Sequence, residues 1–151
     1  MAEPVPDGRL DEPDWRQAAW VTLDGSCPAR PRDEAKWREL EIMVGKDVRT
    51  QFENRIRAAV LWTPNGLYFG FSVDDADIIG RMKDGEWLWL EDVVELFLAP
   101  AARPGEKYIE IQLSPANAVF INAPPGVSFG RPATGVRFDG VLNDSRQKDR
   151  R

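Results

Sequence analysis

The amino-acid sequence predicts an all-β fold, an antiparallel β-sandwich of the jelly-roll or immunoglobulin-like kind. Three segments alternate between apolar and other side chains, at residues 67–73, 85–98 and 108–113, and residues 55–62 also carry strand signals. A period of two is typical of strands that bury one face. Turn-forming residues separate these segments, most clearly Pro64-Asn65-Gly66. We therefore expect paired strands whose apolar side packs against a second layer.

Length and composition fit a single domain. The chain has 151 residues, of which 42 % are hydrophobic, and a chain of this size can bury most of its apolar surface. We expect one domain over residues 1–151, with its core at about 8–140 and a disordered polar tail at 143–151. The fold is expected to be truncated at its C-terminal end, which would leave an unpaired sheet edge open to association.

Composition also excludes several classes of function. The chain has no histidine and a single cysteine, Cys27, which removes histidine-dependent nucleophiles, histidine-ligated metals and paired-cysteine sites. The formal net charge of −5 argues against nucleic acid or an anionic membrane as a partner. The first residues have neither the basic start nor the apolar run of a signal peptide, and the cellular location stays open.

The N-terminal part of the chain is expected to supply anchors for the core. A single helical turn places Trp15, Ala18 and Trp20 against the body of the domain. Residues 24–34 and 44–54 are expected to be loops, whereas the mixed signals at 33–43 fix no state.

The hairpin at residues 55–73 is the clearest local feature. Its second strand is expected to turn Leu67, Phe69, Phe71 and Val73 toward the core, and Tyr68, Gly70 and Ser72 away from it.

An acidic loop follows this hairpin, with Asp74, Asp75 and Asp77 inside four residues. Three carboxylates at this spacing can hold a hard cation such as Ca²⁺ through oxygen ligands. They can equally form Asx turns in a solvated loop. No cofactor is required by the sequence, and structural calcium is the one candidate.

Residues 85–98 form the most distinctive segment. As one continuous strand it would bury Leu88, Leu90, Val94, Leu96 and Leu98, with Asp92 among them. The opposite face would carry Trp87, Trp89, Glu91, Val93, Glu95 and Phe97. A merely solvated face rarely contains two tryptophans, so we expect this face to bind something.

Residues 108–113 repeat the design, with Ile109, Ile111 and Leu113 on one side. The two segments together would present Trp89, Glu95, Tyr108, Glu110 and Gln112 to a common side, with Trp87 in reserve if the loop exchanges the tryptophans. Aromatic planes beside hydrogen-bond acceptors suit a ligand with apolar C–H faces and hydroxyl groups. We therefore expect a carbohydrate ligand.

At this point the chain resembles a known family. Segments 8–18, 67–71, 89–98 and 108–111, in this order and spacing, resemble the family 9 carbohydrate-binding modules, β-sandwiches of a group that includes DOMON domains. The resemblance implies non-catalytic binding of plant-type polysaccharides such as xylan or cellulose, often at chain ends, and often structural calcium. It gives Trp89 the role of a stacking ring and Glu95 that of a hydroxyl acceptor. It implies further polar contacts from Glu110 and Gln112, while the strands that carry the family's second tryptophan have no counterpart here.

Two other interpretations of the function stay open. A structural or interaction β-sandwich would have kept this fold and lost the sugar. A glycoside hydrolase would draw its two carboxylates from Glu91, Glu95 and Glu110, with a separation of roughly 5–10 Å.

Overall fold

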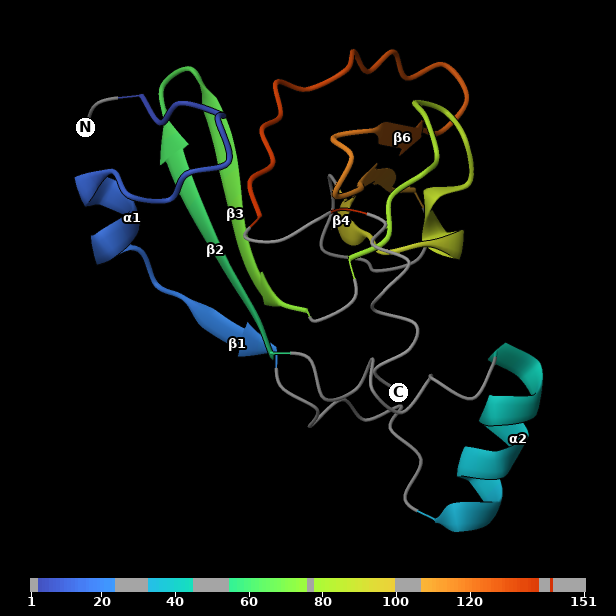
Figure 1. Ribbon diagram of the computed structural model, residues 1–151. Helices are drawn as coiled ribbons and strands as arrows, with labels where there is room; N and C mark the ends of the chain where they lie inside the picture. Colours follow the sequence, from blue (N-terminus) through green and yellow to red (C-terminus); the bar gives the residue numbers. More distant parts are fainter. Residues whose placement is uncertain are drawn as a thin grey trace. The chain divides into compact units, whose positions relative to one another are not determined.

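The computed structural model describes residues 3–23, 33–44, 55–75, 78–99, 107–138 and 142. This part of the chain forms two three-stranded antiparallel sheets with few helices (Figure 1), which confirms the all-β class. Predictions for Cys27, Asp77, most of the three loops at 24–34, 44–54 and 99–107, and the tail at 143–151 lie outside the described residues. Among the described residues, no helix combines the length and apolar character that crossing a bilayer requires.

The chain divides into two compact units. The first contains Met1–Pro4 and Leu10–Asp75, and the second contains Val5–Arg9 and Ala76–Arg151. In the first unit, strands β1 (Val21–Leu23), β2 (Arg55–Thr63) and β3 (Gly66–Asp74) pair in the order β1-β2-β3. Helix α2 (Glu34–Val44) occupies the segment whose sequence signals were mixed.

The β2–β3 hairpin confirms the predicted turn. Thr63 pairs with Gly66, so that Pro64 and Asn65 alone connect the strands. The Glu3 carboxylate accepts hydrogen bonds from Thr63, Asn65 and Tyr68, which ties the N-terminal segment to this hairpin. These bonds hold the pKa of Glu3 below its ordinary value, with the Tyr68 hydroxyl the largest cause.

The core of the first unit is built around Trp15, as the sequence predicted. Trp15 lies in the short helix α1 (Pro13–Gln17) and is buried against Ala59 and Leu61 of β2. The Trp20 indole donates a hydrogen bond of 2.9 Å to the Trp15 carbonyl, and this bond braces the chain after the helix. Trp20 is half-buried, so both tryptophans act as anchors.

The prediction that Tyr68 and Gly70 face away from packed side chains is wrong. Gly70 is buried, and Tyr68 packs against the Trp15 cluster, whereas Leu67 on the opposite side of the strand is 56 % exposed. The reason is that the N-terminal segment covers this side of the sheet, where a glycine leaves room for the indole. A Cβ at Gly70 would lie 2.9 Å from Trp15 Cζ3.

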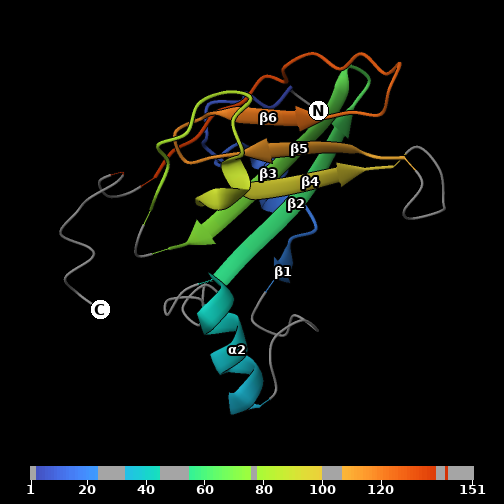
Figure 2. The same cartoon turned by 90° about the vertical axis from the view of Figure 1, so that its right-hand side faces the viewer.

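The second unit contains strands β4 (Val94–Leu98), β5 (Ile109–Leu113) and β6 (Val119–Asn122), paired in the order β4-β5-β6 (Figure 2). The prediction of one strand over 85–98 is only partly right. Residues Leu88–Leu90 form a 3₁₀ helix, η1, in which Leu88 is fully buried and Leu90 is exposed.

The carboxylates that follow η1 explain the break. Asp92 accepts a hydrogen bond of 2.6 Å from the Ile79 N–H, and Glu91 accepts one of 3.0 Å from the Met82 N–H. The Asp92 N–H in turn donates to the Ile79 carbonyl at 3.3 Å. The Asp92 N–H is thus bonded to Ile79 and is not available to a neighbouring strand. The two carboxylates hold the same stretch of chain against the segment at 79–82.

Replacement of Gly70 by alanine should destabilise the first unit. The added Cβ would contact the buried Trp15 ring and come within 3.1 Å of Leu10 Cδ2, and overpacking of this kind costs typically about 1–3 kcal/mol. Gly66→Ala is the matched control, because no atom lies within 4 Å of that position. Thermal unfolding followed by tryptophan fluorescence measures both. Equal midpoints for the two variants would contradict the packing of Trp15 over Gly70.

Candidate functional site

The register of β4, β5 and β6 gathers polar and aromatic side chains on one side of the second sheet. Gln112 lies between Glu95 and Phe120, and Glu110 lies between Phe97 and Asn122. We call the side formed by these six residues the polar–aromatic face. The opposite side of the same strands carries Val94, Leu96, Leu98, Ile109, Ile111, Leu113, Val119 and Ile121. The residues of β4 and β5 therefore alternate between the two sides as predicted. The predicted burial is wrong for β5, because Gln112 on the polar side is buried and Ile109, Ile111 and Leu113 are only half-buried.

A single side-chain amide joins the two carboxylates of this face. Gln112 Nε2 donates hydrogen bonds of 2.8 Å to Glu95 Oε1 and 2.7 Å to Glu110 Oε1. Gln112 is only 1 % exposed, whereas Glu95 is exposed and Glu110 is half-buried. The amide is thus the floor of the cluster, and the carboxylates are open to solvent above it.

The charge of Glu110 influences the ionisation of Glu95. Partial burial raises the pKa of Glu95, and the nearby charge of Glu110 raises it further. Both effects disfavour the charged form of Glu95. The Gln112 amide offsets part of this cost, because a donor shared between two acceptors reduces their repulsion.

Two tryptophans lie beside this cluster, next to Phe120. The rings of Trp87 and Trp89 stack with centroids 5.3 Å apart and an interplanar angle of 19°. Trp89 meets Phe120 edge-on at 5.5 Å. Trp87 is 63 % exposed and Trp89 is 44 % exposed. Trp89 therefore supports the stack, and Trp87 offers the larger open surface.

A second aromatic pair lies at the other end of the face. Phe97 and Tyr108 meet edge-on with centroids 5.3 Å apart, and both side chains are exposed. Phe97 is the cross-strand partner of Glu110. Aromatic rings therefore lie on both sides of the carboxylate–amide cluster.

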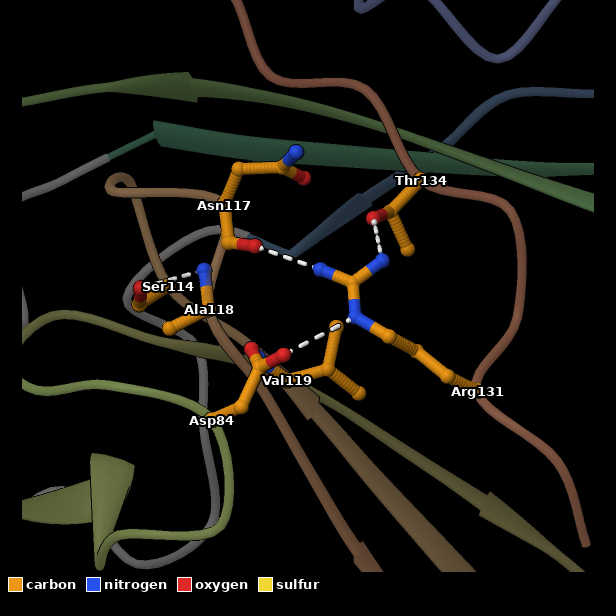
Figure 3. Close-up of polar contacts among 7 residues, drawn as sticks. All are labelled: Asp84, Ser114, Asn117, Ala118, Val119, Arg131 and Thr134. Atoms are coloured by element: carbon orange, nitrogen blue, oxygen red, sulfur yellow. Dashed lines mark hydrogen bonds and ion pairs between the residues drawn. The ribbon is translucent and has the colours of Figure 1, made fainter.

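A network at the start of β6 fixes the loop that carries the tryptophans (Figure 3). Asp84 Oδ1 accepts a hydrogen bond of 2.8 Å from the Val119 N–H, and the Gly85 N–H donates to the Val119 carbonyl at 3.0 Å. Arg131 binds Asp84 Oδ2 at 3.1 Å and the Asn117 carbonyl at 2.8 Å. Val119 directly precedes Phe120, so these bonds set the distance between the tryptophan loop and the sheet.

The ionisation of Asp84 reflects this network. The Val119 N–H, and after it the Arg131 guanidinium, hold the pKa of Asp84 below its ordinary value. Donors of this kind favour the charged carboxylate.

The calcium site expected at Asp74, Asp75 and Asp77 stays a prediction. Asp74 ends β3 opposite Arg55, and Asp77 lies outside the described residues. In the part of the chain that the structure describes, no group of three or more Asp, Glu, Cys or His side chains is placed to hold a metal ion.

The structure brings most of the predicted site residues together. Glu95, Glu110 and Gln112 are in direct contact, Tyr108 reaches them through Phe97, and Trp87 and Trp89 reach them through Phe120. Phe120 and Asn122 were not predicted as site residues. The alternation of Val119-Phe120-Ile121-Asn122 is the signal that could have found them.

Comparison with protein-family models, with curated proteins and with solved structures finds no match to this chain.

Replacement of Glu95 by glutamine should stabilise the second unit at neutral pH. A glutamine oxygen can still accept from Gln112, while the repulsion by Glu110 disappears. We expect a gain of less than about 1 kcal/mol, because the pair is largely screened by solvent. A raised carboxyl pKa penalises the fold above that pKa, so the gain should vanish as the pH falls below about 4. Thermal unfolding between pH 3 and 8 tests this, with the exposed Glu39→Gln as control. A loss of stability at neutral pH would contradict it.

Asp84→Asn should weaken the network at the tryptophan loop. The lowered pKa of Asp84 stabilises the fold above the ordinary aspartate value of about 3.9, and this contribution is lost as the pH falls through the lowered value. The variant should therefore unfold earlier than the native chain at pH 7, and the difference should shrink in acid. Near-ultraviolet circular dichroism should also lose signal from the stacked tryptophans. The exposed Asp11→Asn is the control, and identical behaviour of the two variants would refute the role of Asp84.

Proposed function

We propose that this chain is a non-catalytic carbohydrate-binding domain whose polar–aromatic face binds a poly- or oligosaccharide, as the resemblance to family 9 modules implies. The observation that carries the proposal is the aromatic rings on both sides of a carboxylate–amide cluster. Sugar rings place apolar C–H faces against aromatic planes and direct hydroxyl donors to acceptors at their rim. Xylan and cellulose, whose rings are flat and equatorially substituted, are the polysaccharide ligands that fit this pattern.

The proposed fold is an antiparallel β-sandwich. Each sheet has an apolar side with half-buried residues, such as Phe69 and Phe71 on the first sheet and Leu96 and Ile111 on the second. Burial of apolar strand faces against one another is the usual way in which antiparallel sheets cover such sides.

Trp87 is the proposed stacking platform, with Trp89 beneath it. The stack with Trp89 covers one face of the Trp87 ring, and the high exposure of Trp87 leaves the other available. Phe97 and Tyr108 supply the second apolar contact, in place of the second tryptophan that the family's later strands carry.

The expected affinity is modest. Stacking one sugar on one ring removes roughly 100–200 Å² from water, which corresponds to a few kcal/mol at about 25 cal/mol per Å². After the cost of association, a dissociation constant between about micromolar and millimolar follows.

The same geometry disfavours hydrolysis. Retaining glycosidases hold their carboxyl groups about 5–5.5 Å apart and pass the sugar's anomeric carbon between them. Here the nitrogen of Gln112 occupies the space between Glu95 and Glu110. The third carboxylate, Glu91, is engaged with the backbone of Arg81 and Met82.

An interaction domain without sugar binding is the second candidate. It is favoured by the exposed apolar side of the first sheet, where Trp62 is 76 % exposed beside exposed Val60 and Leu67. Contiguous apolar surfaces of this kind often mark contacts with other proteins.

Titration with cello- and xylo-oligosaccharides, followed by tryptophan fluorescence, separates the two candidates. We expect a saturable change in the native chain and a loss of affinity of about tenfold or more in Trp87→Ala, since a stacking ring contributes about 1.4 kcal/mol or more. Trp62→Ala removes an exposed indole from the other unit and should leave binding unchanged.

The opposite pattern would overturn the proposal. If no oligosaccharide binds, and the chain self-associates in a way that Trp62→Ala abolishes, the interaction role is the correct one. Release of reducing ends from polysaccharide would instead establish an enzyme.

A further inference from the structure

We propose that the polar–aromatic face prefers sugars that carry a protonated primary amine over neutral sugars of the same shape. This inference rests on the proposed carbohydrate binding and names the ligand class of the same site. The ligand would be a pyranose with an amino group on the ring, held by its C–H face on Trp87 and by its ammonium group on the outer carboxylate oxygens of Glu95 and Glu110, above the Gln112 amide.

The charges of the face support a cationic ligand. Glu95 and Glu110 both approach the same nitrogen, while the other described positions of the face, Phe97, Gln112, Phe120 and Asn122, bear no charge. No lysine or arginine among these strand positions balances the two carboxylates. The chain as a whole has a formal net charge of −5, which adds a long-range attraction for cations.

The carboxylates of the face have acceptor oxygens left for such a ligand. Gln112 Nε2 donates to Oε1 of Glu95 and to Oε1 of Glu110. Glu110 Oε2 receives one long bond, of 3.4 Å, from Asn122. The face therefore has more acceptors than donors, and an ammonium group supplies three donors and no acceptor.

The aromatic rings select a sugar rather than a simple amine. A cation alone would use only the carboxylates, whereas an amino sugar also buries its C–H face on the exposed Trp87 ring. Phe97 and Tyr108 offer a second apolar contact on the far side of Glu110. A chain of such sugars could reach both.

Calorimetric titration with three β-1,4-linked oligosaccharides of equal length tests the inference. Their rings carry a free amine, an N-acetyl group or a hydroxyl at the same carbon, and at pH 6 the amine is protonated. We expect the amine form to bind about 5- to 10-fold more tightly than the other two. The preference should decrease as salt is raised, because exposed charges are screened.

Two variants distinguish the site from the overall charge of the chain. Glu110→Gln should lower the ratio of amine to hydroxyl affinity to about 2 or less. Glu39→Gln makes the same change in charge at an exposed position of α2 and should leave this ratio as it is in the native chain.

Each other outcome of these titrations would overturn a specific part of the proposal. Equal affinity for all three oligosaccharides overturns the amine preference and leaves the proposed function standing, whereas binding of none overturns both. An equal loss of preference in Glu110→Gln and Glu39→Gln would make the effect one of overall charge and overturn the site. A monomeric alkylamine that binds as tightly as the amino sugar would overturn the role of the aromatic rings.

Discussion

The contact between the Gln112 amide and the carboxylates of Glu95 and Glu110 is the interaction on which the polar–aromatic face depends. Two carboxylates on neighbouring strands repel each other, and one buried nitrogen within 2.8 Å of both gives them a common partner. Because the amide lies beneath the carboxylates, their outer oxygens stay available to a ligand. Burial and the charge of Glu110 raise the pKa of Glu95, and a cation bound to the two carboxylates would relieve their repulsion.

The tryptophan platform depends on a different set of bonds. The Asp84 carboxylate accepts from the Val119 N–H, and the Gly85 N–H donates to the Val119 carbonyl. These two hydrogen bonds join the loop before η1 to β6. Leu88, which lies between Trp87 and Trp89 in the sequence, is fully buried and gives this loop its apolar anchor. The carboxylates and the rings are thus positioned separately, and each can be altered without removal of the other.

Local sequence pattern predicted the hairpin at 55–73 and the alternation of β4 and β5, because neighbouring residues alone determine which sides of a strand are apolar. It could not predict the break at η1, which depends on hydrogen bonds that the Glu91 and Asp92 carboxylates accept from the backbone N–H groups of Met82 and Ile79. Alternation also cannot say which side of a sheet is covered. The role of Gly70 beneath Trp15 follows from a contact across 55 residues, and no local pattern contains it.

The most direct test of the account is a ¹H–¹⁵N NMR titration that follows the indole N–H of each tryptophan and the side-chain amide of Gln112 as an oligosaccharide is added. We expect the Trp87 indole and the Gln112 amide to shift together and to saturate at one ligand concentration. The signals of the buried Trp15 and the exposed Trp62, both in the first unit, should stay in place. Shifts at Trp62 with Trp87 and Gln112 unmoved would contradict this expectation, because the ligand would then bind a surface without the carboxylates.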